Sequence, residues 1–232
     1  MARSTGPPSN TILSRCPPEL FTGRTETVAL KQGFVLQTVG QKAGDIYFPL
    51  TFLASFVRPL ADGATVEVGI VGCEGLVGLE QLYGAKAQPN EVIAQIADDA
   101  VVIAADYARS LFNRDETFRS IVLPFGNAFT MQIGQTAACN RRHTLEARLA
   151  RWLLMVYDRM GKSTLELTQE FLAQMLGTRT AGVSEAVGSL SYSGLIRHSR
   201  RQIEVVDRKG LEEMSCECYR LVRKFYEKDR VM

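Results

Sequence analysis

The chain has 232 residues, of which 46% are hydrophobic and 22% are charged, an ordinary composition for a folded globular protein. This length suits one or two domains, each large enough to bury a core. No stretch approaches the roughly 20 apolar residues that a membrane-spanning helix needs. The first ten residues also lack the apolar segment of a signal peptide. We therefore expect a cytoplasmic protein without a membrane partner.

Charge is distributed unevenly along the chain, although the net charge is only +2. Residues 1–140 contain 10 Lys and Arg against 13 Asp and Glu, a net charge of −3. Residues 141–232 contain 17 against 12, a net charge of +5. A basic half that follows an acidic half is typical of a DNA-binding domain attached to a domain of another kind.

The first hundred residues contain short apolar or alternating runs, separated by turn signals at glycine and aspartate. A short helix is expected from Asn10 to about Phe21, interrupted by two prolines. Many short strands with regular turns predict a β-barrel or jelly roll. The expected strands are Thr27–Leu30, Val35–Val39, Ile46–Pro49, Phe52–Arg58, Val66–Val71, Val92–Ile96 and Ala100–Ala104.

A glycine-rich segment interrupts these strands and predicts a short helical insertion over Glu74–Tyr83. Glycine lets backbone amides approach an anion closely, so the segment is a candidate cradle for an effector. The alternative is that these glycines only turn the chain. The candidate effector pocket comprises Gly72, Glu74, Gly75, Gly78, Leu79, Lys86, Asn90 and Glu91.

The pattern changes from strand to helix at Asp106, and a first helix is expected over Asp106–Phe112. From Asp115 onward, side chains recur at spacings of four and three, which is the pattern of a coiled-coil seam. We expect this seam to form a dimer, and a core helix within one subunit is the alternative. The predicted dimerisation residues are Phe118, Val122, Phe125, Phe129, Gln132, Ile133 and Thr136.

Pro124 lies within this helical pattern and predicts either a kink or the start of a new helix. We favour a helix that runs mainly from Pro124 to about Cys139, with a shorter turn before it. Asn140–Arg142 is expected to end this helix and form a hinge. The next amphipathic helix is expected over Thr144–Met160.

The most informative segment lies in the C-terminal half. Thr168 is suited to cap a helix that extends through Met175, and Gly177 supplies a left-handed turn. A second helix is expected over Thr180–Tyr192, and Arg197–Asp207 alternates as a hairpin with basic residues at its tip. This order of a helix, a short turn, a second helix and a basic wing is typical of a winged helix-turn-helix.

This plan predicts which side chains read DNA. An α-helix fits the major groove, and the outward side chains near its N-terminus reach base edges. Arg179 is suited to pair with guanine and Glu185 to accept from the cytosine amino group, whereas side chains that only face solvent are the alternative for both. Arg200 and Arg201 add positive charge at the flank. The expected DNA-binding residues are Thr168, Gln169, Thr178, Arg179, Thr180, Gly182, Ser184, Glu185, Arg197, Arg200 and Arg201.

The order of barrel, long helix, hinge and winged helix-turn-helix resembles the Crp/Fnr family of transcription regulators over nearly the whole chain. The resemblance rests on Val68–Gly75, Cys139–His143, Leu167–Gly177 and the run from Arg179 to Ile196. It implies an α+β fold and a homodimer on a palindromic DNA site. It also implies a sensory barrel of the cyclic-nucleotide-binding type that controls the two recognition helices, with RNA polymerase as a further partner.

Three parts are expected: a sensory β-barrel over residues 1–105, a dimerisation helix and hinge over 106–142, and a winged helix-turn-helix over 143–232. The predicted function is that of a homodimeric, sequence-specific transcription regulator that binds double-stranded DNA. The alternative is a small-molecule sensor whose helical C-terminus binds a protein. The basic flanks favour DNA.

The sensor departs from the cyclic-nucleotide pattern of the family. Members that bind cyclic nucleotides carry Gly-Glu followed by Arg-Ser/Thr-Ala, and the Arg neutralises the cyclic phosphate. The corresponding stretch here is Ala87–Val92, which contains Glu91 and no Arg. A phosphate buried there would lack a partner, and Lys86 is not expected to compensate. We expect that cyclic AMP does not bind, and the effector itself is not specified by the sequence.

No cofactor, metal site or catalytic residue is expected. An iron–sulfur site needs a cysteine cluster, and the first 100 residues offer only Cys16 and Cys73. A haem would need an axial ligand, and Cys73 suits a small buried residue better. Cys216 and Cys218 lie two apart on one expected C-terminal helix and point in different directions, which argues against a metal site. The expected apolar face of that helix comprises Leu211, Met214, Cys218, Leu221 and Phe225.

Overall fold

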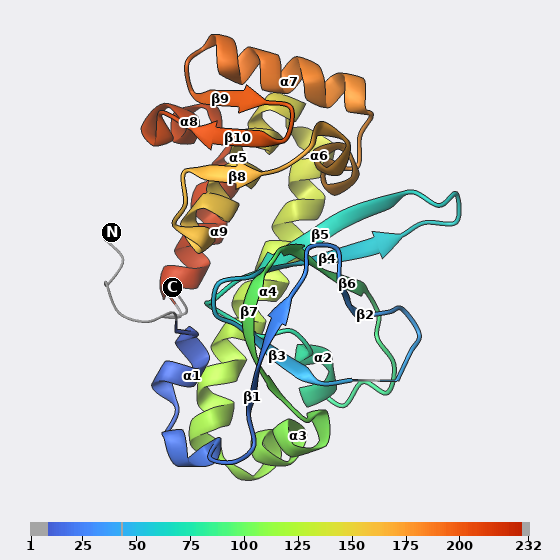
Figure 1. The fold of residues 1–232 in the computed structure, drawn as a ribbon, viewed down its shortest axis with the longest axis vertical. Coiled ribbons are helices and arrows are strands. Elements are labelled where there is room, and N and C mark those ends of the chain that lie inside the picture. Colours follow the sequence, from blue (N-terminus) through green and yellow to red (C-terminus); the bar gives the residue numbers. More distant parts are fainter. Residues whose placement is uncertain (1–8, 43, 229–232) are drawn as a thin grey trace. The chain divides into compact units, whose positions relative to one another are not determined.

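The computed structural model describes residues 9–42 and 44–228 (Figure 1). These residues divide into two compact units. The N-terminal unit contains the chain up to residue 56, residues 69–130 and the chain from residue 225, and the C-terminal unit contains residues 57–68 and 131–224. Within the described ranges, no helix is both long and apolar enough to cross a membrane.

The N-terminal unit is built on two sheets (Figure 1). One has the strand order β1 (Glu26–Leu30), β7 (Asp98–Ile103) and β3 (Ile46–Pro49). The other has the order β2 (Val35–Gln37), β6 (Glu91–Ile96), β4 (Leu53–Pro59) and β5 (Thr65–Val71), and the outer ends of β4 and β5 belong to the C-terminal unit. All seven predicted strands are present within two residues of their expected ends. Across the described residues no strand belongs to both sheets, so the predicted jelly roll is confirmed as two open sheets.

Short helices flank or connect these strands. Helix α1 (Thr11–Arg15) and a 3-10 turn at Pro18–Leu20 precede β1, α2 (Leu79–Leu82) lies between β5 and β6, and α3 (Ala105–Arg114) follows β7. Asn10 caps α1, because its side-chain oxygen accepts hydrogen bonds from the amides of Ile12 and Leu13. Its Nδ2 donates to the carbonyl oxygens of Pro49 and Gly75, at 3.0 and 2.7 Å. The predicted interrupted N-terminal helix and the helical insertion after β5 are both confirmed.

Helix α4 (Glu116–Arg142) is 27 residues long and continues through Pro124. The prediction of a helix that starts mainly at Pro124 is therefore wrong. A proline inside a helix removes one backbone hydrogen bond and costs roughly 3 kcal/mol. Four large apolar side chains are buried on the two sides of the proline, and burial of one such side chain contributes about 1.5–3 kcal/mol. They are Phe118, Val122, Phe125 and Phe129.

The predicted dimerisation seam lies on the inner face of α4. The ring of Phe129 packs against Phe125, with centroids 6.0 Å apart, and against Phe56 of strand β4 at 4.7 Å. A side chain that is already covered within one chain cannot pack against a second copy. The seam prediction is therefore wrong, and the alternative of a core helix describes this face. Six of the seven seam residues are buried and Ile133 is half-buried, the buried ones being Phe118, Val122, Phe125, Phe129, Gln132 and Thr136.

The C-terminal unit combines helices with a small sheet. The helices are α5 (Leu145–Met160), α6 (Gln169–Leu176), α7 (Thr180–Tyr192), α8 (Arg208–Met214) and α9 (Glu217–Lys228). The sheet has the order β8 (Thr164–Glu166), β10 (Gln202–Val205) and β9 (Ile196–Ser199). Strand β8 was not predicted, because three residues are too short to show an alternating pattern.

The C-terminal segment forms two helices, whereas the sequence pattern predicts one. Helix α8 ends at Met214, and Cys216 lies between α8 and α9. The buried side of α9 contains Tyr219, whose hydroxyl donates to Asp158 at 2.6 Å. Burial and this hydrogen bond raise the pKa of Tyr219. The predicted apolar face is wrong at Met214 and Leu221, which are exposed, and the buried residues of α9 are Cys218, Tyr219, Val222 and Tyr226.

Candidate nucleic-acid interface

The helix-turn-helix is formed by local capping interactions at the predicted positions. The hydroxyl of Thr168 accepts a hydrogen bond from the amide of Phe171 at 3.2 Å and begins α6. Gly177 ends α6 with φ +59°, a left-handed conformation that only glycine adopts cheaply. Helix α7 then begins at Thr180 and ends at Tyr192, as predicted.

Helix α7 has one buried and one exposed face. Its buried face consists of Val183, Ala186, Val187 and Leu190, which pack where α7 meets α5 and α6. The exposed face begins with Thr180, Ser184 and Glu185, and the backbone of Arg179 caps the helix. The polar side of the recognition helix therefore projects away from the core of its own unit.

Other predicted residues of the helix-turn-helix are less accessible. Thr168, Gln169 and Thr178 are half-buried. Gly182 is half-buried too, and a Cβ there would lie 3.1 Å from the side chain of Leu145. These residues position the two helices, and only the polar atoms at their surface are available to a ligand.

Sequence reasoning missed four exposed residues on the same face of α7. Tyr192 is 95% exposed, which is unusual for an aromatic side chain. Its spacing from Glu185 places it on the same side of the helix, so helical periodicity could have predicted that Tyr192 is exposed. The other missed residues are Ala181, Gly188 and Ser189.

The wing presents two exposed cations at its tip. Arg200 and Arg201 lie in the exposed turn between β9 and β10. Arg197 lies on β9 and was predicted at the tip, but its guanidinium pairs with Glu204 across the hairpin, with Nη1 and Oε2 2.6 Å apart. The charge of Arg197 is therefore offset by its neighbour, whereas the tip keeps its positive charge.

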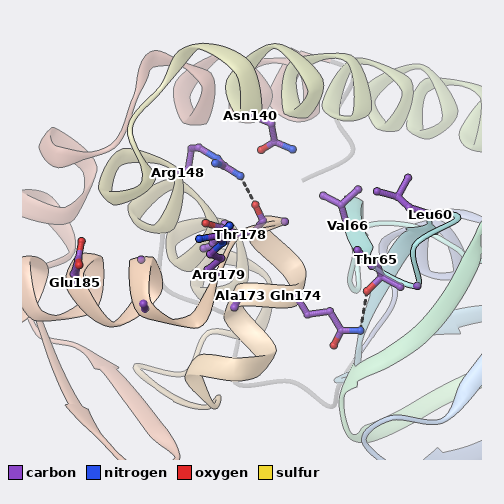
Figure 2. Close-up of a pocket in the computed structure, with 16 residues that line it drawn as sticks. Leu60, Thr65, Val66, Asn140, Arg148, Ala173, Gln174, Thr178, Arg179 and Glu185 are labelled. Carbon is purple, nitrogen blue, oxygen red and sulfur yellow. Dashed lines mark hydrogen bonds between the residues drawn. The ribbon is translucent and has the colours of Figure 1, made fainter.

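A groove opens beside the turn of the helix-turn-helix (Figure 2). It measures about 950 Å³, and Arg179 and Glu185 belong to its lining. Its other wall is the tip of the β4–β5 hairpin, which belongs to the same unit. Gln174 Nε2 donates to Thr65 Oγ1 at 2.8 Å, and Arg148 donates to the carbonyl of Leu176. Burial lowers the pKa of Arg148.

The hairpin tip is also anchored on helix α5. The indole Nε1 of Trp152 donates to Glu67 Oε1 at 2.7 Å, and both side chains are buried. Burial of a carboxylate costs free energy unless the carboxylate has a hydrogen-bonding partner, so this contact fixes the hairpin to helix α5. Strand β5, whose Thr65 contacts Gln174 of α6, is thereby held beside the turn of the helix-turn-helix.

The candidate effector residues lie in the connection from β5 to α2, in the loop that follows α2 and at the start of β6. Glu74 is buried and accepts a hydrogen bond from the amide of Gly72 at 3.1 Å. A Cβ at Gly75 would lie 2.0 Å from the ring of Phe125, and Gly78 has φ +104°. These two glycines are explained by close packing and by the turn. Leu79 begins α2, Lys86 and Asn90 lie in the following loop, and Glu91 begins β6.

Comparison with known proteins identifies the helix-turn-helix. The model of the Crp-like helix-turn-helix domain matches residues 147–214, which contain α6, α7 and the wing. The chain is a transcription regulator of the Crp/Fnr type with a helix-turn-helix DNA-binding domain.

Three proteins illustrate what the chain is similar to. It is 26% identical over 149 residues to the transcriptional regulator SdrP of Thermus thermophilus, covering 63% of this chain and 69% of SdrP. The structure of FixK2 from Bradyrhizobium japonicum matches with a TM-score of 0.72 and 16% identity, over 83% and 98% of the two chains. The c-di-GMP responsive regulator CLP of Xanthomonas campestris matches with a TM-score of 0.66 and 14% identity, over 81% and 97%.

We predict that Gly177→Ala lowers the free energy of unfolding of the chain by at least 1–2 kcal/mol, roughly the cost of a left-handed conformation for alanine. The new Cβ would also lie 2.7 Å from the side chain of Val66. Urea denaturation followed by circular dichroism measures the change. Gly188→Ala is the matched control, because Gly188 is helical with open space around it and alanine there should stabilise by up to about 1 kcal/mol. Equal stability of the two variants would contradict this account of the turn.

Proposed function

We propose that this transcription regulator acts as a homodimer that reads a specific DNA sequence with helix α7. The supporting observation is the exposed polar face of α7 on a helix whose opposite face is buried. Residues 1–105 serve as the sensor, residues 106–142 as the dimerisation helix and hinge, and residues 143–232 as the DNA-binding domain. RNA polymerase is the further partner of a regulator of this kind.

Individual residues of the proposed interface have different tasks. Arg179 pairs with guanine and Glu185 accepts from cytosine, since both lie in the exposed first two turns that enter the major groove. Arg200 and Arg201 contact phosphates, because a wing tip with exposed cations suits the DNA backbone. Thr180 and Ser184 supply hydroxyl groups on the same face. Arg197 contributes less, owing to its ion pair with Glu204.

We predict that Arg179→Ala relaxes base preference at one position of each half-site, a loss of about 1–3 kcal/mol of discrimination. The double change Arg200→Ala and Arg201→Ala should weaken binding to all sequences and reduce the salt slope by about 2. The operator is first selected from a random DNA pool. Fluorescence anisotropy then measures affinity for matched and mismatched duplexes at several salt concentrations.

Lys31→Ala is the control, because it removes an exposed positive charge from the N-terminal unit. Identical effects of the Arg179 and wing changes on matched and mismatched duplexes would contradict the assigned roles. Absence of salt-sensitive binding to any duplex would favour the alternative, a sensor whose helical C-terminus binds a protein.

The dimer is proposed to form through the outer face of α4, in place of the buried seam. Leu123 and Met131 are 45% and 39% exposed on this helix. Open space surrounds Gly134, and Ala138 is exposed one helical turn further on. Apolar side chains followed by small ones let two helices approach closely. This face can pack against a second copy without disturbing the core of either chain.

We predict that Leu123→Asp combined with Met131→Asp converts the dimer to a monomer, because two buried carboxylates would face each other across the contact. Light scattering after size-exclusion chromatography measures the mass. The matched control is Phe34→Asp with Val39→Asp, at apolar residues that are 48% and 41% exposed outside α4. An unchanged dimer in the α4 variant, or a monomeric unsubstituted chain, would exclude this face.

The N-terminal unit is proposed to respond to a signal other than cyclic AMP. Glu91 begins strand β6 where a cyclic phosphate would need a cation, and Lys86 in the preceding loop is exposed. The tight packing of Gly75 against Phe125 gives that glycine a structural role. CLP, with the same fold, is a c-di-GMP responsive regulator, so the fold itself does not select cyclic AMP.

We predict no saturable heat when the chain is titrated with cyclic AMP at micromolar concentrations by isothermal calorimetry. The physical reason is that an anion buried beside Glu91 would lack a compensating charge. Binding of the selected operator by the same preparation serves as the control for folded protein. A saturable isotherm with one site per chain would overturn the proposal.

A further inference from the structure

Four metal-binding side chains converge in the C-terminal unit, outside the helix-turn-helix. Cys139 lies near the end of α4, His143 follows that helix directly, Cys216 lies between α8 and α9, and Cys218 is in the first turn of α9. Their ligand atoms all lie within 4.8 Å of one another. The three cysteines are buried and carry free thiols. We propose that this cluster binds one Zn²⁺ ion through three cysteine sulfurs and one histidine nitrogen.

The local backbone explains how four donors reach one point. Cys139 and His143 are four residues apart, and the amide of His143 donates to the carbonyl of Cys139 at 3.1 Å, so both side chains leave the same side of the last helical turn. Cys216 precedes α9 and is not part of a helix, so the argument from helical spacing against Cys216 and Cys218 does not apply. The break between α8 and α9 therefore lets both cysteines face the end of α4.

The distances suit a single tetrahedral ion. Zinc–sulfur bonds of about 2.3 Å place two sulfurs about 3.8 Å apart, and a sulfur and a histidine nitrogen about 3.6 Å apart. The Sγ atoms of Cys139 and Cys216 are 3.5 Å apart, and Cys218 Sγ lies 3.5 Å from Nδ1 of His143. A disulfide would need an S–S distance of about 2.05 Å. A polynuclear iron–sulfur cluster would hold its ligands farther apart than a single ion does.

Neighbouring polar groups orient the donors as they do around a bound metal. The Oε2 of Glu217 lies 3.2 Å from Nε2 of His143, which keeps the proton on Nε2 and leaves Nδ1 to bind the ion. Gln135 Nε2 donates to Cys218 Sγ at 3.0 Å. Zn²⁺ with three thiolates and a neutral histidine would have a net charge of −1.

Zinc at this position would have a structural role. With four protein ligands the ion keeps no open position for substrate, as in other structural zinc sites. It would fasten the last turn of α4 and the hinge to the α8–α9 junction, and so hold helix α9 on the C-terminal unit. Because free energy of metal binding contributes to folding, removal of the ion should lower the stability of this unit.

The experiment measures metal in the full-length chain purified under reducing conditions without chelators. Mass spectrometry of the metals should find one zinc per chain, and an organomercurial that blocks thiols should release it to a colorimetric indicator. Cys216→Ser should lose most of this zinc. Cys16→Ser is the matched control, because it removes a buried thiol of the N-terminal unit and should keep the full zinc content.

A second measurement stays informative if Cys216→Ser fails to fold. Replacement of the metal in the unsubstituted chain by Co²⁺ should produce the strong visible bands of tetrahedral cobalt together with sulfur-to-cobalt charge transfer. Four outcomes would each overturn the proposal. They are the absence of zinc after reconstitution, equal retention of zinc in Cys216→Ser, an iron–sulfur chromophore, and a Cys139–Cys216 disulfide in the reduced preparation.

Discussion

Helix α7 can face DNA because its other side is buried against α5 and α6, and the C-terminal unit is organised around this packing. Val183, Val187 and Leu190 are fully covered. Because Val183, Val187 and Leu190 face the core, Thr180, Ser184 and Glu185 on the opposite side of α7 face outward. Side chains three and four residues apart share a face of a helix. The tight turn at Gly177 sets the point at which α7 begins. The hairpin tip on the other side of the turn holds it there, through Gln174 and Thr65.

The two faces of helix α4 have different roles. Its inner face contributes Phe118, Phe125 and Phe129 to the core, and this burial carries the helix through Pro124 without a break. Its outer face keeps Leu123 and Met131 exposed for the proposed self-association. The proposed zinc site would fix the last turn of the same helix to the α8–α9 junction.

Much of the fold could be predicted because its signals are local. The bounds of α7 followed from Gly177, a capping position and apolar spacing, and all seven N-terminal strands followed from alternation and turns. The seam on α4 was misassigned because apolar residues at spacings of four and three look alike in a coiled coil and in a core helix. The β8 strand was too short to show a pattern. The exposure of Tyr192 could also have been predicted, because its spacing from Glu185 places both side chains on one face of α7.

By itself, the sequence determined the bounds of the seven N-terminal strands, of α6 and of α7, and it indicated that α7 presents a polar face. Caps, glycine conformations and side-chain periodicity act within a few residues. Only the tertiary structure decided which face of α4 is covered, that Arg197 is paired with Glu204, and that Cys139 and His143 lie beside Cys216 and Cys218. Burial and ligand geometry depend on segments far apart in the chain, and those segments meet only after the whole unit has packed.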